Sequence, residues 1–424
     1  MISPAIAATV DSGKVGVALV EQLAHGRYDE AIAGFDAKMK QVVSRKQLED
    51  VWAGLTAKAG AYQGHGDPVV SREAGYGIAV VPVHFARDTV GLRVVIDAAS
   101  HVAGFFIVPP PPAAPPPREL PSSYTERKLT VGADGWPLPA TLTLPRGQGP
   151  FPAVLLVHGS GPNDRDESVG GTKVFRDLAL GLTVRGVAVL RYEKRTRVLG
   201  ARMAGKPITV QDETVDDAVA TVALMQKQPE LDARRIFVLG HSLGGSLIPR
   251  IGARATGAAG LIVLEGNTRP LEELLVDQIR YIMSVTALPE ADKAKAIAEA
   301  EDTARQIRDP DLAKRDPKAA IFHAPPSYWL DLRGYRPAEE AARLPQPMLV
   351  IQGERDYQVT LKDFAAWKAA LSSRKDVTLK TYPRLDHRGV EGEGPSTPAS
   401  YGPPAHVSEQ LIADIASWVL ATRH

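Results

Sequence analysis

Seven of the nine residues from Pro109 to Pro117 are prolines, and this run restricts the fold of the chain more than any other feature. Proline fixes the backbone φ angle and has no amide N–H, so the run joins neither a helix interior nor a central strand. We expect a polyproline II spacer of about 28 Å if fully extended, at roughly 3.1 Å per residue. The spacer predicts an N-terminal domain over 1–108, a linker over 109–123 and a second domain over 124–424.

The N-terminal domain divides into a helical half and an extended half. Apolar residues recur at helical spacing in three segments, 15–23, 28–35 and 45–57. Three apolar or alternating runs, separated by turn residues, follow at 77–85, 90–96 and 101–108. Helices followed by such a meander predict a small α+β domain with its helices packed on one face of an antiparallel sheet.

After the linker, short apolar strands alternate with helices. A β-ribbon is predicted over 127–131 and 140–144. Further strands are predicted at 153–157, 187–192, 236–239, 261–264, 348–352 and 377–382, and helices at 175–185, 215–226 and 243–255. This alternation predicts an α/β fold with a mainly parallel sheet covered by helices on both faces. Such a sheet carries its chemistry beyond the carboxyl ends of its strands.

The segment from Ile236 to Gly245 is an apolar strand followed by Gly-His-Ser-Leu-Gly-Gly and a helical stretch. A sharp turn from strand into helix strains the central residue, and glycines two positions away on either side leave room for the turn. The turn exposes the Ser242 hydroxyl at a helix N-terminus, where backbone amides favour a developing oxyanion. Ser242 is therefore the predicted nucleophile.

A serine nucleophile needs a base, and the base needs an orienting carboxylate. When the serine lies on such a turn, the acid follows a later strand and precedes the histidine. Asp356 lies just after the predicted strand 348–352 and is the predicted acid. Glu265, directly after the strand 261–264, is the alternative acid, whereas Glu354 is expected to face solvent.

Three histidines follow the predicted acid: His387, His406 and His424. His387 comes after the strand 377–382 and a turn, where a loop-borne base belongs, and it is the predicted base. His406 at the start of the last helix is the alternative, and His424 is the terminal residue. Asp386 is not expected to orient His387, because neighbours in an extended stretch point to opposite faces.

An oxyanion hole takes two backbone amides, one from the residue after the nucleophile and one from the loop after an earlier strand. These are predicted to be Leu243 and Ser160, with Gly161 as the alternative to Ser160 and as a candidate substrate contact. His158 is expected to brace this loop, with a second catalytic base as the alternative reading. Two charged runs at the same edge, 163–167 and 191–195, are expected to fix their loops by ion pairs or to contact the substrate.

Composition narrows the function further. The chain has 50 Lys and Arg against 49 Asp and Glu, a balance that gives no field to draw it onto nucleic acid or an anionic membrane. Cysteine is absent, which excludes thiol catalysis, disulfide scaffolds and cysteine-ligated metal sites.

No stretch has the ~18–20 continuous apolar residues of a membrane-spanning helix. The small apolar N-terminus is read either as the stub of a trimmed signal peptide or as a frayed end. Under the first reading the protein is periplasmic or secreted.

Four motifs together resemble the α/β-hydrolase superfamily, and the resemblance runs over about residues 124–424. The motifs are the segment 155–166, Gly-His-Ser-Leu-Gly-Gly, Gly-Glu-Arg-Asp-Tyr-Gln-Val and Leu-Asp-His. The likeness is to bacterial esterases and lipases often called serine-aminopeptidase-like. Residues 14–108 resemble the small nuclear-transport-factor-2-like or cystatin-like α+β domain that often precedes such hydrolases in exported bacterial proteins. Arg388 departs from the apolar residue common after the histidine, so we expect a more polar pocket wall there.

The resemblance implies a helical cap for the interruption at 267–343, where helices are predicted over 271–285 and 289–308. Tyr328 and Trp329 in this segment are candidate substrate contacts or cap core. The resemblance and the residues together predict a serine hydrolase of small-molecule carboxylic esters that needs no metal or organic cofactor. An aminopeptidase or amidase and a non-catalytic binding protein are the alternatives. The N-terminal domain is a candidate for homodimerisation or protein contact.

Overall fold

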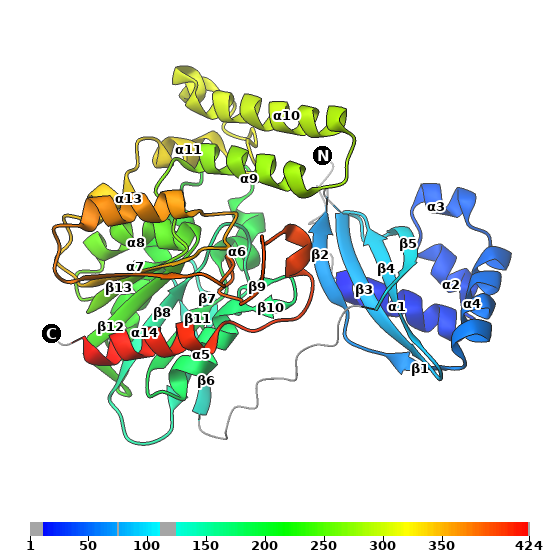
Figure 1. Ribbon diagram of the computed structural model, residues 1–424, viewed down its shortest axis with the longest axis horizontal. Helices are drawn as coiled ribbons and strands as arrows, with labels where there is room; N and C mark the ends of the chain where they lie inside the picture. The colour runs from blue at the N-terminus through cyan, green and yellow to red at the C-terminus, as the bar shows by residue number, and fades with distance from the viewer. Residues whose placement is uncertain (1–11, 74–75, 111–123, 423–424) are drawn as a thin grey trace. The chain divides into compact units, whose positions relative to one another are not determined.

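The computed structural model describes residues 12–73, 76–110 and 124–422 (Figure 1). The chain divides into two compact units, one of residues 1–117 and 399–405 and the other of residues 118–398 and 406–424. Of the linker predicted over 109–123, only residues 109 and 110 fall within the described residues. Its conformation therefore stays a prediction.

The first unit is a layer of helices on an antiparallel sheet. Its helices are α1 (Ser12–Ala24), α2 (Tyr28–Ala33), α3 (Ala37–Val42) and α4 (Arg45–Ala59). Its strands are β1 (Tyr62–His65), β2 (Val69–Glu73), β3 (Tyr76–Phe85), β4 (Thr89–Ile96) and β5 (Val102–Val108). The strands follow the order β1-β3-β4-β5. Strand β2 also pairs with β3, at a different part of that strand from β1. The predicted α+β fold of this unit is confirmed.

Local sequence explains where the helices of this unit begin. Helix α4 starts behind Ser44, whose side chain accepts from the Gln47 backbone N–H while the Gln47 side chain accepts from the Ser44 backbone N–H. The apolar face of α4 buries Leu48 and Trp52, which pack with Phe35 and the inward residues of the sheet into one core. The members of this core all belong to the first unit.

The second unit is built on an eight-stranded sheet in the order β15-β14-β13-β12-β8-β11-β7-β6. Its strands are β6 (Tyr124–Val131), β7 (Leu138–Pro145), β8 (Phe151–Val157), β11 (Ala188–Tyr192), β12 (Leu231–His241), β13 (Gly260–Leu264), β14 (Met348–Gly353) and β15 (Val377–Tyr382). The six strands from β15 to β11 are parallel to their neighbours, and β7 and β6 continue the sheet antiparallel. A separate two-stranded ribbon is formed by β9 (Ser168–Val169) and β10 (Thr172–Lys173).

Helices cover both faces of this sheet, as the alternation in the sequence predicts (Figure 1). One face is covered by α7 (Asp216–Met225), α8 (Leu243–Arg254) and α13 (Leu361–Leu371), and the other by α5 (Val174–Thr183) and α14 (Glu409–Ala421). Helix α6 (Arg195–Met203) and a π-helical turn, η1 (Gln211–Val215), precede α7, and a short 3-10 turn, η3 (Pro398–Tyr401), precedes α14. The predicted fold class, a mainly parallel sheet with helices on both faces, is confirmed.

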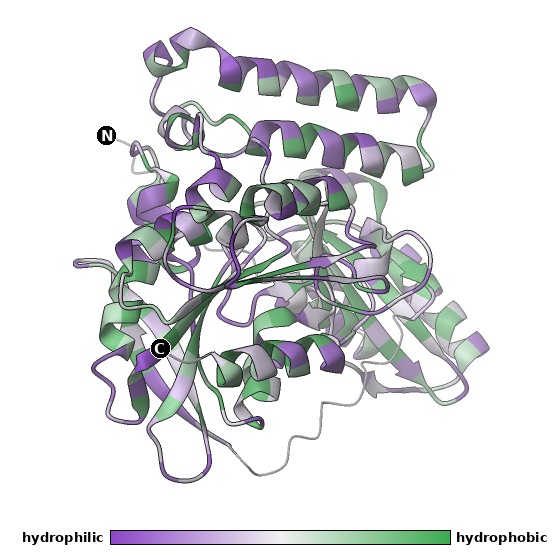
Figure 2. Cartoon of the chain, turned by 60° about the vertical axis from the view of Figure 1, so that its left-hand side comes forward, coloured by the Kyte–Doolittle hydropathy of each residue, from purple (hydrophilic) through white to green (hydrophobic). Residues whose placement is uncertain are grey.

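The chain between β13 and β14 forms an excursion of helices, which we call the cap. It contains α9 (Leu271–Val285), α10 (Glu290–Arg308), η2 (Pro310–Lys314), α11 (Pro326–Leu332) and α12 (Pro337–Ala341). Helices α9 and α10 bury Val276, Ala300 and Ala304 between them. In Figure 2 much of α10 carries hydrophilic colour while the strands of the central sheet are mostly hydrophobic. In the part of the chain that the structure describes, no helix has the length and apolar character needed to cross a membrane.

Candidate active site

Ser242 occupies a strained turn between β12 and α8. Its φ and ψ angles are 55° and −121°, a left-handed region that L-residues rarely adopt. The flanking glycines are sterically required, because a Cβ atom on Gly240 would lie 2.2 Å from the carbonyl oxygen of Gly244. A Cβ atom on Gly244 would lie 2.4 Å from the carbonyl oxygen of Val157. The Ser242 backbone N–H donates to the carbonyl oxygen of Leu264 at 2.9 Å, which fixes the turn against β13.

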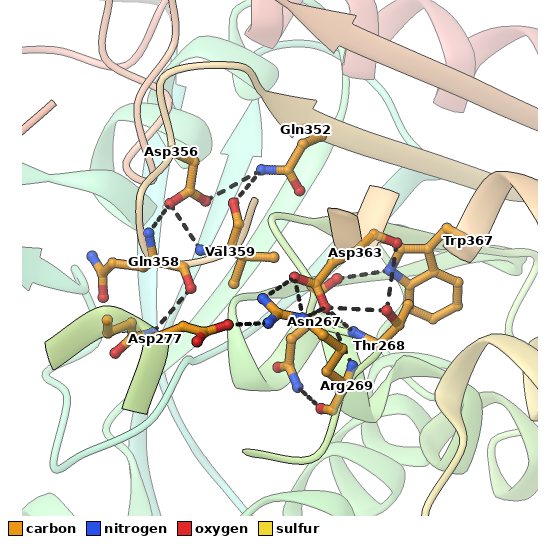
Figure 3. A network of polar contacts seen from close by, with 12 residues as sticks. Asn267, Thr268, Arg269, Asp277, Gln352, Asp356, Gln358, Val359, Asp363 and Trp367 are labelled. Carbon is orange, nitrogen blue, oxygen red and sulfur yellow. Dashed lines mark hydrogen bonds and ion pairs between the residues drawn. The ribbon is translucent and has the colours of Figure 1, made fainter. Parts of the chain in front are cut away.

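The predicted acid and base lie in contact. Nδ1 of His387 is 2.6 Å from Oδ2 of Asp356, and the two side chains are only 6% and 0% exposed. The other carboxylate oxygen of Asp356 accepts the backbone N–H groups of Gln358 at 2.7 Å and Val359 at 3.0 Å (Figure 3). Because Asp356 holds a proton on Nδ1, the neutral His387 ring has its lone pair on Nε2 and can act as a base there.

The alternative acid and base have other partners. Glu265 is buried with a φ of 54°, and its Oε1 accepts the backbone N–H of Gly353 at 2.7 Å. Burial, together with the charge of Asp356, raises the pKa of Glu265 well above its ordinary value. Nδ1 of His406 lies 3.0 Å from Asp177. His424 lies outside the described residues.

Two further residues near the predicted base are placed by the structure. Glu354 is exposed, as its position after β14 suggests. Asp386 pairs with the buried guanidinium of Arg388 at 2.7 Å, and Arg388 also donates to the Thr172 hydroxyl at 3.1 Å. The expectation that Arg388 makes a pocket wall more polar was wrong, because this guanidinium is held in the interior by Asp386 and Thr172.

The loop after β8 packs against the nucleophile turn. A Cβ atom on Gly159 would lie only 3.0 Å from the Cβ atom of Ser242, so glycine is needed for this close approach. Ser160 follows in the loop and is exposed. Leu243, on the other side of the nucleophile, is the first residue of α8. Within the described part of the chain, the backbone N–H groups of Ser160 and Leu243 donate to no protein acceptor.

His158 braces this loop from beneath. Its Nε2 donates to the carbonyl oxygen of Asp164 at 3.0 Å, and its ring packs against Phe175 and Tyr192. Burial lowers the pKa of His158 to about 4, so the ring is neutral at pH 7. Among the hydrogen bonds and ring contacts of the described residues, none joins His158 to the predicted catalytic residues, and its contacts are those of a structural residue.

The charged runs at the same edge bond to each other and to the loop. Arg165 donates to Glu193 at 2.7 Å, and Arg191 is paired with Asp166. Their partners are protein groups, which accords with the expected loop-fixing role.

A second buried pair, which the sequence did not reveal, involves His241, the residue before the predicted nucleophile. Nδ1 of His241 is 2.9 Å from Oε2 of Glu167, and Nε2 of His241 is 2.7 Å from the carbonyl oxygen of His387. Both partners are acceptors, so both ring nitrogens donate and the ring is an imidazolium beside a carboxylate. Burial opposes this charge, but the charge of Glu167 and its hydrogen bond outweigh burial and raise the pKa of His241. The pair ties the nucleophile turn to the loop of the predicted base.

A cavity of about 610 Å³ adjoins the loop after β8. Its lining includes all four predicted contacts near that loop and in the cap, Ser160, Gly161, Tyr328 and Trp329. The polar atoms of the two aromatic side chains have partners, because Tyr328 donates to Glu213 at 3.2 Å and Trp329 to the Ile321 carbonyl at 2.8 Å. The rings therefore present mainly apolar surface to the cavity.

A polar network anchors the first residues of the cap (Figure 3). The carboxylate of Asp363 in α13 is fully buried and accepts the Thr268 backbone N–H at 2.9 Å and the Arg269 guanidinium at 2.9 Å. Burial alone raises the pKa of Asp363, but the hydrogen bonds from Arg269 and Thr268 outweigh it and lower the pKa. Trp367 donates to the Gly266 carbonyl at 2.7 Å in the same network. The chain leaving β13 is thus fixed before α9 begins.

Comparison with known proteins assigns the family. Residues 154–398 match the alpha/beta hydrolase family. The chain belongs to this family. Residues 17–105 of the hydrolase match a second family, described as a protein of unknown function (DUF3887). Membership of the α/β-hydrolase superfamily, predicted from the motifs, is confirmed, whereas the likenesses to the serine-aminopeptidase-like group and to nuclear-transport-factor-2-like or cystatin-like domains stay predictions.

The hydrolase is similar in sequence to two bacterial enzymes and in structure to solved esterases. It is 35% identical over 403 residues to Esterase EstD of Thermotoga maritima, a match that covers 95% of this chain and 93% of EstD. It is 28% identical over 251 residues to a monoacylglycerol lipase of Mycolicibacterium smegmatis, covering 52% and 87% of the two chains. The solved structure of a Pyrococcus furiosus esterase covers 73% of this chain and 98% of its own, at 15% identity and a TM-score of 0.45. The similarity to EstD over nearly all of both chains supports an ester hydrolase as the enzyme class.

Proposed function

We propose that this hydrolase cleaves carboxylic esters through Ser242, His387 and Asp356 and an acyl-enzyme intermediate. The similarity to EstD over nearly all of both chains supports the coarser assignment, an ester hydrolase. The proposal of a Ser-His-Asp mechanism rests on one observation, the buried 2.6 Å contact between Asp356 and His387, which come from two different loops. The strained turn at Ser242 supplies the serine that such a pair would activate.

In the proposed reaction, Nε2 of His387 takes the hydroxyl proton of Ser242 as the Ser242 oxygen attacks the ester carbonyl carbon. Asp356 stabilises the imidazolium that forms. The backbone N–H groups of Ser160 and Leu243 donate to the oxyanion of the tetrahedral intermediate. The intermediate collapses, the C–O bond to the alcohol breaks, and His387 returns the proton to the alcohol oxygen. Water, deprotonated by His387, then attacks the acyl carbon. The bond from that carbon to the Ser242 oxygen breaks, His387 returns the proton to this oxygen, and the acid is released.

The 610 Å³ cavity is the proposed site for an apolar part of the ester. Apart from Ser160 and Gly161 it is lined mainly by the cap and by helix α6, with apolar residues such as Met203, Leu275 and Trp329. Apolar walls with a few polar groups are typical of small-molecule sites. We therefore expect kcat/KM to depend strongly on the length of the acyl chain. A charged group at the distal end of the acyl chain is not expected to raise it.

A paired assay tests the proposal. Wild-type protein and Ser242→Ala are compared on p-nitrophenyl esters of increasing acyl length and on aminoacyl p-nitroanilides, and both are treated with a fluorophosphonate probe. We expect ester turnover by the wild type, inert anilides, labelling of Ser242 alone, and a loss in kcat of roughly 10⁴–10⁶ for S242A with unchanged folding. Faster cleavage of the anilides would instead make the protein an aminopeptidase or amidase. No labelling and no turnover would make it a binding protein.

The role of the N-terminal unit as a dimerisation or protein-contact module stays a prediction. Light scattering of the full chain at several concentrations measures its mass in solution, and a concentration-independent monomer would remove dimerisation from consideration.

A further inference from the structure

The two peptide groups on either side of Gly159 are each held by a buried charged side chain. The backbone N–H of Gly159 donates to Oε1 of Glu167 at 2.7 Å. The carbonyl oxygen of Gly159 accepts from Nζ of Lys194 at 2.7 Å and, less closely, from Nδ2 of Asn163 at 3.2 Å. Gly159, Glu167 and Lys194 are all buried, with Lys194 only 1% exposed. Both ends of Gly159 are therefore fixed by groups of opposite charge that solvent does not screen.

The bond to Lys194 sets the direction of the neighbouring amide. In a trans peptide the carbonyl of one residue and the N–H of the next lie in one plane and point in opposite directions. Because the Gly159 carbonyl points at buried Lys194, the N–H of Ser160 points the other way, out of the interior. Ser160 is exposed on the large cavity, and the Gly159 backbone beside it packs on Ser242.

A buried lysine is an unusual residue for the contact with the Gly159 carbonyl if the contact only stabilises the loop. Burying an ammonium group is costly unless it is paired, and a neutral donor would bind a carbonyl oxygen at less cost. The pairing is present, since Oε1 of Glu213 lies 3.4 Å from Nζ of Lys194. Glu213 itself is supplied by the π-helical turn η1, a feature often found at functional sites. A charge on the carbonyl side also polarises the peptide group and strengthens its N–H as a donor.

Strand order brings these groups together. Lys194 follows β11, Gly159 follows β8 and Ser242 follows β12, and β8 lies between the other two strands in the sheet. The three strands are parallel, so their carboxyl ends meet at one edge. Lys194 reaches Gly159 from the side opposite the nucleophile strand.

We propose that Lys194 positions and polarises the Gly159–Ser160 peptide, while Glu167 fixes the preceding peptide group, so that the Ser160 N–H is oriented for the oxyanion before the substrate arrives. Lys194 is a positioning residue and does not itself touch the substrate. Orientation established in advance costs no reorganisation during the reaction, so its benefit appears in the transition state. The inference rests on the proposed ester hydrolysis at Ser242.

The first test uses Lys194→Met, which keeps the stem of the side chain, with Lys368→Met on the exposed face of α13 as the matched control. We expect K194M to lower kcat by about 10- to 100-fold with KM within about threefold, somewhat less than the loss of a direct oxyanion donor. Affinity for an alkyl boronic acid, which forms a tetrahedral adduct with the serine, is expected to fall in step with kcat. Affinity for the product carboxylate is expected to stay within about threefold of wild type. A loosened fold would weaken the binding of both ligands, so a loss for the boronic acid alone points to the oxyanion.

The second test isolates the charge at constant side-chain length. Because the chain has no cysteine, Lys194→Cys carries a unique thiol that can be alkylated in denaturant before refolding. Bromoethylamine rebuilds an ammonium group at the length of lysine, and iodoacetamide places a neutral amide donor at the same length. We expect the aminoethyl form to reach kcat within about threefold of refolded wild type and the amide form to stay at least about tenfold lower.

The outcomes separate the two proposals. Fluorophosphonate labelling of wild-type Ser242 is measured first, and its absence together with absence of ester turnover would overturn the proposed function. If the enzyme is labelled, two results would overturn the role of Lys194 and leave the proposed function standing. One is equal kcat and equal boronate affinity for wild type and K194M, and the other is the same equality for the aminoethyl and amide forms. K194M that fails to fold leaves the alkylated pair as the deciding comparison, since both forms have the same backbone and side-chain length.

Discussion

Nδ1 of His387 and Oδ2 of Asp356 lie 2.6 Å apart in the interior of the second unit, and the remaining carboxylate oxygen is held by two backbone N–H groups. A carboxylate bound in this way cannot rotate away from the histidine without breaking those bonds. The loop after β14 therefore restrains the orientation and the tautomer of the His387 ring.

Asp356→Asn is expected to lower kcat on p-nitrophenyl esters by about 10³–10⁴, with KM within a few-fold of wild type. The amide can present an N–H to Nδ1, which favours the tautomer with its proton on Nε2 and removes the base. Steady-state kinetics measure the loss, and far-UV circular dichroism checks the fold. Activity within tenfold of wild type would remove Asp356 from the proposed triad.

Glu265→Gln is the matched control for that variant, because Glu265 is the other carboxyl group buried beside the same loop. Burial and the charge of Asp356 raise the pKa of Glu265 well above its ordinary value, which favours the protonated carboxyl group, and the amide that replaces it has nearly the same shape. The amide oxygen can still accept the Gly353 N–H. We expect kcat within about threefold of wild type at pH 7. A loss above 100-fold would show that Glu265 is the functional acid.

His158 is expected to make the fold less stable as the pH falls. The pKa of His158 is about 4 in the folded protein and near 6.5 in the unfolded chain, so the unfolded chain binds more protons between these values. The stability that the neutral ring provides is full above pH 6.5 and falls as the pH drops toward 4, by about 3 kcal/mol at pH 4. Urea unfolding at pH 7 and pH 4 measures this loss.

His158→Gln is the comparison for this pH effect, since the amide keeps a donor for the Asp164 carbonyl and does not titrate. The variant is expected to be less stable at pH 7 but to lose about 3 kcal/mol less than wild type between pH 7 and pH 4. Equal losses in the two proteins would contradict a lowered pKa for His158.

Asp363→Ala is expected to lower the free energy of unfolding by about 3–5 kcal/mol, because it leaves the Arg269 guanidinium without its buried partner. Asp277 binds the same guanidinium but is 45% exposed, so Asp277→Ala should cost less than about 1 kcal/mol. Urea unfolding at pH 7 gives both values. A similar loss for both variants would show that burial of Asp363 does not decide its contribution.

Much of the second unit follows from the sequence because its signals are local. The apolar strand before Gly-His-Ser-Leu-Gly-Gly, and the acidic residue just past the strand 348–352, can each be recognised within about ten residues. Helix α6 was missed because Arg195–Met203 is largely polar and basic and shows no clear apolar period. Strands β1 and β2 were missed because each is short, and both are defined by pairing with β3.

The parts of the site that sequence reasoning could not predict depend on contacts between distant segments. Glu167 was seen only as one member of a charged run, yet it reaches His241, 74 residues away, and the neighbouring Gly159 loop. Lys194 was likewise one charge in the run 191–195, and its bond to Gly159 spans 35 residues. No local pattern distinguishes a buried lysine or glutamate of this kind from its exposed neighbours in the same run.

Strands β13 and β14 are hydrogen-bonded neighbours, with Leu261 opposite Met348, so the cap leaves and re-enters the sheet at adjacent positions. The nucleophile turn and the Gly159 loop both lie before this excursion in the chain, and the acid and base both lie after it. The residues proposed for bond cleavage are thus held by the sheet, whereas much of the cavity is walled by the excursion. Substrate preference can therefore be altered by exchanging one continuous piece of chain, with the bond-cleaving residues left as they are.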